Sequence, residues 1–385
     1  MVLALYLMKS FKSITIRPLL YPLAMLCNTT IGIGLFSLPY IASRVGLLIM
    51  ALYILVLGCI VGAIHLMFGE IALETPDFKR MPGFARHHLG QTAEIVISSC
   101  IIVSLIGIMV AFGSIGGEFL YNAAGPLLGG QPVLYSVIYL ILGSLLVFFG
   151  INIVEKIEFW GLILFLLALA AIIFKALPYF KWDNLTIGGG TSDLFLPYGA
   201  VLFALWGASS IPEVEEMLGR KRKKKYLPAL ILVSSFVAPV IYLIFIVAVV
   251  GFTGIYTTES AIAGFGHIFG PKLLSLVYIF GLVVTFTSFV IVGLTLKKIL
   301  NYDLKISKTK AWLITAGLPL VLLFCGLNNF LAIISFIGGV TLGIEGIVIL
   351  LMYQKIRPDK KFITYPLGLV MFAAMFYEIF YFFKL

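Results

Sequence analysis

Apolar runs of roughly twenty residues alternate with short polar segments along almost the whole chain. A helical run of this length matches the hydrocarbon core of a bilayer, which is about 30 Å thick. Eleven such runs are predicted as membrane spans, at 18–42, 46–70, 93–121, 132–150, 154–177, 195–217, 227–252, 271–296, 311–327, 329–353 and 363–383. The pattern therefore predicts an all-α, polytopic membrane protein with about eleven transmembrane helices.

The distribution of charge supports this topology. Hydrophobic residues make up 61% of the chain and charged residues 11%, which excludes a soluble globular protein. A net charge of +10 would suggest nucleic acid in a soluble protein, but with the N-terminus inside, 22 of the 27 Lys and Arg fall in predicted cytoplasmic segments. We therefore expect a plasma-membrane protein with a cytoplasmic N-terminus and an extracellular C-terminus. The basic run at 220–225 is mainly a topology determinant, and recruitment of anionic lipid is the alternative.

The first predicted span contains glycines and a proline that a helix crossing lipid does not need. The stretch Asn28-Thr29-Thr30-Ile31-Gly32-Ile33-Gly34 is followed by Pro39. Gly costs roughly 1 kcal/mol in a helix interior relative to Ala, and Pro removes a backbone donor. In hydrocarbon a broken helix is tolerated only where its freed backbone groups line a cavity or lie buried in protein. Such a break is typical of a transporter binding site, and a glycine-lined contact between packed helices is the alternative.

The sixth predicted span contains the same kind of helix break. Phe203-Ala204-Leu205-Trp206-Gly207-Ala208-Ser209-Ser210-Ile211-Pro212 again joins an apolar half-helix, small and hydroxyl residues, and a proline. Since five is an odd number, the second set of five spans enters from the opposite face, and the two sets are inverted. Paired breaks in inverted halves are far more specific for a transporter than one break. We predict a leader at 1–17, a first repeat at 18–177, an inverted second repeat at 195–353 and a peripheral eleventh helix at 363–385.

The two breaks are expected to face each other near the membrane midplane. The N-terminal end of a half-helix presents unpaired N–H groups and a positive dipole end, which suits a carboxylate. Freed carbonyl oxygens, with Thr or Ser hydroxyls, suit an ammonium group or a small cation. The predicted site is therefore complementary to a zwitterion.

Three motifs in the right order resemble a known group of permeases. The first break resembles the glycine signature of the amino acid/auxin permease group and its bacterial tryptophan/tyrosine permease relatives. Residues 203–214 resemble that group's sixth-helix pattern, and Thr287-Ser288-Phe289 with Gly293-Leu294 is similar to the eighth helix of aromatic and hydroxy amino acid permeases. The resemblance implies the APC superfamily and its leucine-transporter (LeuT) fold, a 5+5 inverted repeat with broken helices 1 and 6. Many members carry a histidine where this chain has Ala208, which leaves the substrate and any histidine-based proton coupling open.

The resemblance also implies roles for the residues at both breaks. Backbone groups at 30–34 would hold the α-carboxylate of the substrate, and carbonyls at 203–206 would receive its α-ammonium. Phe203 and Trp206 are candidate gate or pocket aromatics, with ordinary packing as the alternative. The predicted substrate-binding set is Thr29, Thr30, Ile31, Gly32, Ile33, Gly34, Phe203, Ala204, Trp206, Gly207, Ala208 and Ser209.

Ion coupling has two sets of candidates. The resemblance implies a sodium site built from the first break and the eighth helix, at Asn28, Ile31, Thr287 and Ser288; hydroxyls that bond back to their own helix are the alternative. Glu345, about two-thirds along the tenth span, is the candidate for proton coupling or gating, because a charge near the bilayer centre is costly.

Other ionisable groups lie within or beside the predicted spans. Glu118 lies near the outer end of the third span, and Glu70 and His65 lie in the inner half of the second. Each either titrates during transport or is held structurally, and for His65 the structural role is expected. Three carboxylates beside the basic run are predicted to form inner-gate or surface ion pairs, namely Glu213, Glu215 and Glu216.

These features predict a secondary active symporter that moves a neutral L-amino acid inward, with aromatic and hydroxy amino acids as candidates. A proton or sodium gradient would drive this transport. Spans one, two, six and seven would rock against spans three, four, eight and nine, and residues 257–270 would form an outer lid. The sequence has no nucleotide-binding loop, metal-ligand cluster or nucleophile with a base partner, so we expect no enzyme activity and no cofactor. The expected partners are the amino acid and membrane lipid, without nucleic acid or an obligate protein partner.

Two other functions remain open at this stage. An amino-acid-sensing receptor on the same fold, such as a transceptor or a germinant-receptor-like subunit, would bind its ligand without net flux; the short tails argue against it. A membrane-embedded transferase would need clustered His, Asp or Glu near one interface. The histidines do not cluster beyond the His87-His88 pair.

Overall fold

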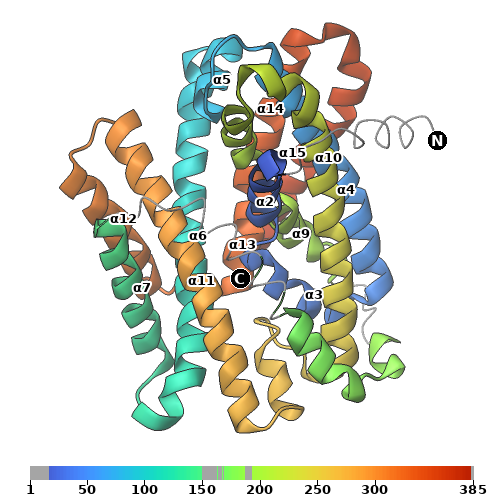
Figure 1. Ribbon diagram of the computed structural model, residues 1–385, viewed down its shortest axis with the longest axis vertical. Coiled ribbons are helices and arrows are strands. Elements are labelled where there is room, and N and C mark those ends of the chain that lie inside the picture. The colour runs from blue at the N-terminus through green and yellow to red at the C-terminus, as the bar shows by residue number, and fades with distance from the viewer. Residues whose placement is uncertain (1–16, 150–162, 164–166, 168, 187–192, 383–385) are drawn as a thin grey trace.

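The computed structural model describes residues 17–149, 163, 167, 169–186 and 193–382. Within these ranges all regular structure is helical, and most helices run roughly along one axis of the molecule (Figure 1). The prediction of an all-α protein is therefore confirmed. The predicted leader at 1–17, apart from its last residue, and most of the predicted fifth span at 154–177 lie outside the described residues.

Helices long enough to cross a membrane account for most of the described chain. Seven apolar stretches among the described residues pass this criterion, and one bent pair of helices adds an eighth. The exact number of eleven stays a prediction, because the fifth span is largely outside the described part. The unbroken crossing helices include α4 (Leu47–Glu74), α6 (Gln91–Leu128), α7 (Pro132–Phe149) and α11 (Pro271–Lys298).

The first predicted break is present. α2 (Arg17–Thr30) ends within the glycine-rich stretch, η1 (Ile33–Phe36) follows two residues later, and α3 (Leu38–Val45) completes the crossing. The two arms are bent by 46°. Proline in the first turn of α3 is tolerated there because the first N–H groups of a helix have no intrahelical partner.

The second predicted break is also present. α9 (Pro197–Leu205) ends before Trp206, whose φ of −77° and ψ of 120° are extended. After Gly207, the short η5 (Ala208–Ser210) leads directly into α10 (Ile211–Thr253). Both interruptions therefore lie where glycine and small residues were predicted to break the helix.

α10 contains the turn between the sixth and seventh predicted spans. The stretch Pro197–Tyr256, from α9 through α10 to the turn after it, is 60 residues long, which at 1.5 Å per residue is about 90 Å, far longer than one crossing. The chain turns at Gly219, whose φ of 66° lies in the left-handed region that favours glycine. The basic run at 220–225 is helical, and its Lys223 is buried against Glu215 across the turn.

The tenth predicted span contains an irregular middle that the hydropathy pattern does not reveal. α13 (Phe330–Phe336) continues through a π-helical segment, η9 (Ile337–Leu342), into α14 (Gly343–Ile356). A Cβ atom on Gly338 would lie 1.9 Å from the carbonyl oxygen of Gly199 in α9. The glycine therefore lets η9 and α9 pack backbone to backbone.

The helices pack into two groups (Figure 1). One group consists of α2, α3, α4, α9 and α10, and the other of α6, α7, α11 and α12 (Lys308–Phe324). α13, η9 and α14 contact both groups, and α15 (Lys361–Phe382) packs mainly on α14, η9 and α13. This division matches the predicted grouping of spans one, two, six and seven against three, four, eight and nine.

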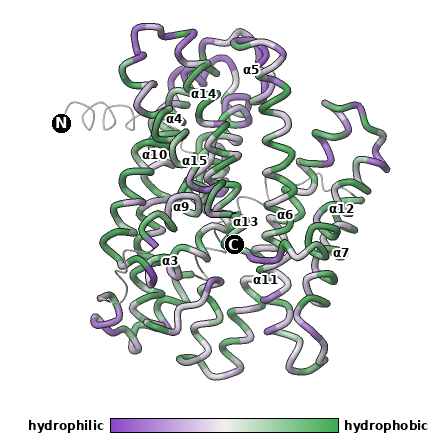
Figure 2. The backbone as a smooth tube through the Cα atoms, turned by 180° about the vertical axis from the view of Figure 1, so that it is seen from behind, coloured by the Kyte–Doolittle hydropathy of each residue, from purple (hydrophilic) through white to green (hydrophobic). Residues whose placement is uncertain are grey.

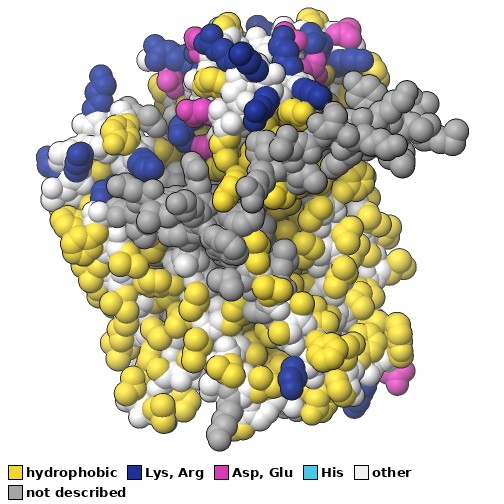
Figure 3. Space-filling view, in the orientation of Figure 1, with side chains coloured by type: hydrophobic (Ala, Val, Ile, Leu, Met, Phe, Trp, Pro, Cys, Tyr) yellow, Lys and Arg dark blue, Asp and Glu magenta, His cyan; other side chains and the backbone are white. Residues whose placement is uncertain are grey.

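Short helices connect the crossing elements at the two ends of the molecule. α5 (Met81–Leu89), a short helix that the hydropathy pattern does not predict, packs on α6 and α14 at one end. Lys and Arg side chains crowd this end, which we call the basic end, above an apolar belt (Figure 3), and hydrophilic residues gather along the backbone at the same end (Figure 2). The other end, called the opposite end, carries connecting turns of the 3₁₀ type, namely η2 (Leu177–Tyr179), η3 (Trp182–Thr186), η6 (Gly254–Tyr256) and η7 (Ala263–His267).

Candidate functional site

The two breaks lie against each other in the interior. A Cβ atom built on Gly34 would lie 2.9 Å from the Cβ of Ala204, and one built on Gly207 would lie 2.6 Å from Oγ1 of Thr30. Contacts this short leave no room for a side chain at either glycine. The expectation that the two breaks face each other is therefore met.

Tyr242 of α10 joins the two breaks. Its buried hydroxyl lies within hydrogen-bonding distance of two carbonyl oxygens, those of Thr30 and Ala204, the latter at 2.7 Å. A tyrosine has one O–H, so it donates to one carbonyl at a time. The hydroxyl thereby supplies a hydrogen-bond donor to carbonyl oxygens near the points where the two helices break, where the regular helical hydrogen bonds end.

His65 of α4 holds the second break from one side. The backbone N–H of Gly207 donates to Nε2 of His65 at 3.3 Å, so the ring accepts at this nitrogen and is neutral there. The imidazole also packs edge-on against the indole of Trp206, with ring centroids 5.4 Å apart. The expected structural role of His65 is therefore located at the break itself.

Glu345 of α14 holds the same break from another side. The indole N–H of Trp206 donates to Oε2 of Glu345 at 3.0 Å, and both side chains are buried. A Cβ atom on Gly346 would lie 3.2 Å from the Trp206 ring, so a glycine at that position allows the indole to approach α14. Trp206 is thus clamped between α4 and α14.

The predicted substrate-binding residues differ in exposure. Thr30, Ile31, Ile33, Gly34, Ala204, Trp206, Gly207 and Ala208 are buried; Thr29, Gly32 and Phe203 are half-buried; Ser209 is exposed. The hydroxyls of Thr29 and Thr30 donate to carbonyls one turn back, those of Met25 and Leu26. The first break therefore offers a ligand mainly backbone groups. η1 starts at Ile33 with no side-chain cap, and the first N–H groups of a helix have no intrahelical acceptor.

The predicted sodium ligands are not joined by hydrogen bonds among the described residues. The hydroxyl of Thr287 lies within hydrogen-bonding distance of the Val283 and Val284 carbonyls in its own helix. Asn28 on α2 and Ser288 on α11 are half-buried. The oxygens of these residues remain suitable in type for a small cation, and the sodium site stays a prediction.

Ion pairs and hydrogen bonds join neighbouring elements at the two ends of the molecule. At the opposite end, Arg44 of α3 pairs with Asp193, ahead of α9, at 3.0 Å. There too, Ser260 of the predicted lid at 257–270 donates to Glu118 of α6 at 2.7 Å. The ion pair lies within the group that contains the broken helices, and the hydrogen bond links the lid to α6 of the other group.

The basic end has its own pairs. Arg80, beside α5, contacts Glu213 at the start of α10. Arg357 contacts Glu70 of α4 at 2.7 Å, and Tyr353 donates to the same carboxylate at 2.8 Å. With the Lys223–Glu215 pair, these contacts confirm the predicted ion pairing of Glu213 and Glu215; Glu216 is exposed and forms none among the described residues.

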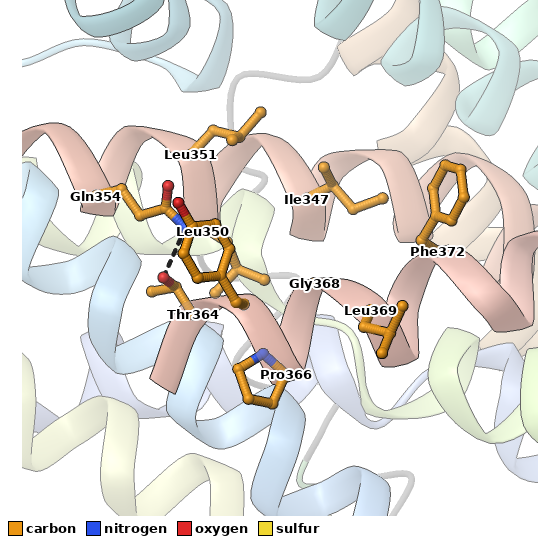
Figure 4. Close-up of a pocket in the computed structure, with 10 residues that line it drawn as sticks. Ile347, Leu350, Leu351, Gln354, Thr364, Pro366, Gly368, Leu369 and Phe372 are labelled. Atoms are coloured by element: carbon orange, nitrogen blue, oxygen red, sulfur yellow. Dashed lines mark hydrogen bonds between the residues drawn. The ribbon is translucent and has the colours of Figure 1, made fainter. Parts of the chain in front are cut away.

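A cavity of about 650 Å³ lies elsewhere, between α14 and α15 (Figure 4). Apolar side chains such as Ile347, Leu369 and Phe372 line it, with a hydrogen bond of 2.7 Å between Gln354 and Thr364 at one end. None of the break residues lines this cavity, and its walls suit an apolar occupant rather than a zwitterion. It is therefore separate from the candidate site.

Two solved structures share this architecture. MhsT in complex with L-phenylalanine superposes with a TM-score of 0.67 at 13% identity, covering 93% of this chain and 98% of that chain. Mhp1, a nucleobase-cation-symport-1 family transporter in a closed conformation with bromovinylhydantoin bound, gives 0.64 at 15% identity, covering 93% and 92%. At such identities the likeness shows the fold, and the predicted leucine-transporter fold is confirmed.

Sequence comparison gives a more specific result. Tyrosine-specific transport system 1 of Haemophilus influenzae is 25% identical over 197 residues, which cover 50% of this chain and 48% of the relative. That match thus spans about half the length of the relative. The model of the tryptophan/tyrosine permease family matches residues 17–381, which include both breaks. A match over almost the entire chain shows that the protein belongs to the tryptophan/tyrosine permease family.

Proposed function

We propose that the protein is a secondary transporter that carries a neutral aromatic L-amino acid across the cell membrane. The observation that carries this proposal is the pair of broken helices held face to face in the interior, within contact distance at Gly34 and Ala204. Backbone irregularity inside a membrane protein is typical of a site that binds ions or zwitterions. The family, the tyrosine transport system among its relatives and the L-phenylalanine bound to MhsT support an aromatic amino acid as substrate.

Each break supplies one half of a zwitterion site in this proposal. The N–H groups at the start of η1, from Ile33 and Gly34, would receive the α-carboxylate, with the positive end of the helical turn behind them. Carbonyls at the end of α9 would receive the α-ammonium, since the chain leaves the helix at Trp206. The hydroxyl of Tyr242, within hydrogen-bonding distance of a carbonyl of each half, would set their spacing by donating to either one.

Alternating access would arise from the two helix groups. The group that contains both broken helices would rock against α6, α7, α11 and α12, which pack on one another. Opening at the opposite end would break the Ser260–Glu118 contact, which joins the lid to α6. Opening at the basic end would break the Arg80–Glu213 contact. An inward gradient of the coupling ion would make the net movement inward.

A proton or sodium gradient would drive net accumulation. The sodium candidates remain Asn28, Ile31, Thr287 and Ser288, with half-buried oxygens on α2 and α11. Glu345 remains a candidate for proton coupling or gating because it is a buried carboxylic acid in direct contact with the second break. Apart from the coupling ion, the proposed transport requires no cofactor.

The test is exchange of a labelled amino-acid panel in proteoliposomes that contain the purified protein. With an unlabelled aromatic amino acid inside, labelled L-tyrosine, L-tryptophan and L-phenylalanine should accumulate by counterflow, whereas L-serine and charged amino acids should exchange poorly. Binding without exchange would contradict transport and favour the amino-acid sensor. Neither binding nor exchange would mean that the breaks serve only packing.

A further inference from the structure

Glu378 is a buried carboxylic acid on α15, outside the candidate site. It lies 17 residues after the start of α15, or about 25 Å along that helix toward the opposite end. Its side chain is only 2% exposed. Its Oε1 accepts a hydrogen bond of 2.9 Å from the backbone N–H of Gly199 in α9. The helix predicted to be peripheral therefore carries a buried acid that binds a half-helix of the second break.

The carboxyl group of Glu378 caps the N-terminus of α9 by accepting a backbone hydrogen bond. Gly199 is the third residue of that helix, so its N–H has no acceptor within the helix, and α9 has no side-chain cap of its own. An ionised carboxylate at this place is stabilised by a charge-assisted hydrogen bond and by the helix dipole. Since α9 ends at Leu205, directly before Trp206, one nine-residue helix joins Glu378 to the second break.

The surrounding backbone is built to admit this side chain. A Cβ atom on Gly199 would lie 2.6 Å from Oε1 of Glu378, and one on Gly339 of η9 would lie 2.1 Å from its Cγ. Any larger residue at these two positions would displace the carboxyl group. Glu378 thus lies in a close-fitting junction of α9, η9 and α15, in which η9 packs on both other helices.

The described part of the chain places no cation on this carboxyl group. Among the described residues, no Lys, Arg or His forms an ion pair with Glu378. The titratable groups that face it are tyrosines: Tyr53 of α4, Tyr198 of α9, and Tyr377 and Tyr381 of α15. Asp193 and its partner Arg44 lie close to Tyr381 of this cluster. A buried carboxylate without a cation is costly, and taking up a proton removes that cost.

We propose that Glu378 is the proton-binding site that couples transport to a proton gradient, an inference that rests on the proposed transport function. The carboxylate takes one proton from the opposite end of the molecule to become a neutral carboxylic acid, and it gives that proton up on the other side after the helices move. The ionised form holds α9 by a charge-assisted hydrogen bond. The neutral form holds it by an ordinary one, which is roughly half as strong. Proton binding therefore loosens the half-helix that forms the second break.

Replacement of the acid by its neutral isostere tests the coupling. Glu378→Gln keeps an acceptor oxygen for Gly199 but cannot ionise, and Glu94→Gln, at the start of α6, is the matched control. In proteoliposomes, Glu378→Gln should lower accumulation of labelled L-tyrosine driven by a pH gradient by at least about ten-fold. It should keep exchange at equal pH near the wild-type rate. Accumulation by Glu378→Gln at the wild-type level would overturn the proposal.

Two further outcomes separate this inference from the proposed function. If the wild type accumulates substrate with a sodium gradient and not with a pH gradient, the transporter stands and the role of Glu378 is wrong. If the Gln variant neither exchanges nor accumulates, a spectroscopic measurement decides whether Glu378 titrates. Infrared difference spectra between acidic and alkaline buffer are recorded for the wild type and for Glu378→Asp. A protonated-carboxyl band that shifts with the Asp substitution supports titration of Glu378, and an unchanged band overturns it, even if no amino acid is transported.

Discussion

The indole N–H of Trp206 donates a hydrogen bond of 3.0 Å to Glu345, which lies 139 residues farther along the chain. This contact attaches Trp206, the residue that follows α9, to the first turn of α14. It also gives a buried carboxyl group in the tenth predicted span a partner. The second break is therefore shaped by α14 as well as by its own glycine.

The role of Glu345 can be separated from its charge. An amide oxygen accepts from the indole as a carboxylate does, so Glu345→Gln should keep most exchange activity. Glu345→Ala leaves the indole N–H without its acceptor, at a cost of about 1–3 kcal/mol, and should lower exchange by roughly ten-fold or more. Labelled-substrate exchange measures both. Loss of gradient-driven uptake in Glu345→Gln alone would instead assign ion coupling to Glu345.

The breaks could be predicted from the sequence because their cause is local. Gly32, Gly34 and Gly207 interrupt apolar runs that are otherwise long enough to span a membrane, and the effect of glycine on a helix depends on few neighbours. The two-group packing was expected from the 5+5 inverted repeat that the resemblance implies. Neither inference needed a side-chain contact.

The partners of the breaks could not be predicted in the same way. Tyr242 and Glu378 reach backbone groups that lie 212 and 179 residues away. In hydropathy Tyr242 resembles any other aromatic residue of a span. Glu378 is an acid within an apolar run, which is a sequence signal, but its helix was predicted to be peripheral and no partner could be assigned to it. α5 is short and half polar, so it does not resemble a span.

Removing one oxygen should loosen the junction of the two breaks. Tyr242→Phe leaves the carbonyls of Thr30 and Ala204 without their shared donor, a loss of about 1–3 kcal/mol. We expect exchange to fall by roughly ten-fold while the protein stays folded, judged by size-exclusion chromatography and circular dichroism. Tyr365→Phe, at an exposed tyrosine on α15, is the control. Equal activity of both variants would show that the hydroxyl does not support the site.

A single methyl group should separate the breaks. Gly34→Ala places a Cβ 2.9 Å from the Cβ of Ala204 and 3.0 Å from its Cα, so backbone must shift. Overpacking of this kind costs about 1–3 kcal/mol, and substrate affinity should fall with it. Gly317→Ala on α12, where a Cβ meets nothing within 4 Å, should bind normally. Equilibrium binding of labelled L-tyrosine compares the two, and unchanged binding in Gly34→Ala would contradict the proposed site.

The ion pair at the basic end should control access to the second break. Arg80→Ala removes the partner of Glu213, and an exposed pair contributes up to about 1 kcal/mol, or roughly five-fold in an equilibrium. Thiol labelling of a Ser209→Cys variant, made in a background without the four native cysteines, reports access to the exposed side chain beside the break. Arg80→Ala should speed this labelling a few-fold. A labelling rate that does not change would argue against a gate at this pair.

Docking of α5 should weaken in acid. Burial and neighbouring His87 lower the pKa of His88 below its ordinary value of 6.5, and its Nε2 lies 3.1 Å from Oγ1 of Thr75. The docked state therefore prefers the neutral ring. Above pH 6.5 the ring is neutral whether α5 is docked or not, and as the pH falls the undocked form takes up a proton first.

Hydrogen exchange of the α5 amides, corrected for intrinsic rates, measures this effect. Protection should decrease as the pH falls below 6.5 in the wild type. In His88→Gln it should depend much less on pH. Protection that increases in acid, or the same pH dependence in the variant, would contradict the assignment to His88.

The central claim, that two facing breaks form the site of a gradient-driven amino acid transporter, is tested most directly by uptake of labelled L-tyrosine into wild-type proteoliposomes. The measurement compares an inward pH gradient, an inward sodium gradient and no gradient. The account predicts accumulation above the external concentration with the pH gradient, and its loss in Gly34→Ala. Tyrosine that binds but never accumulates under either gradient would contradict the claim.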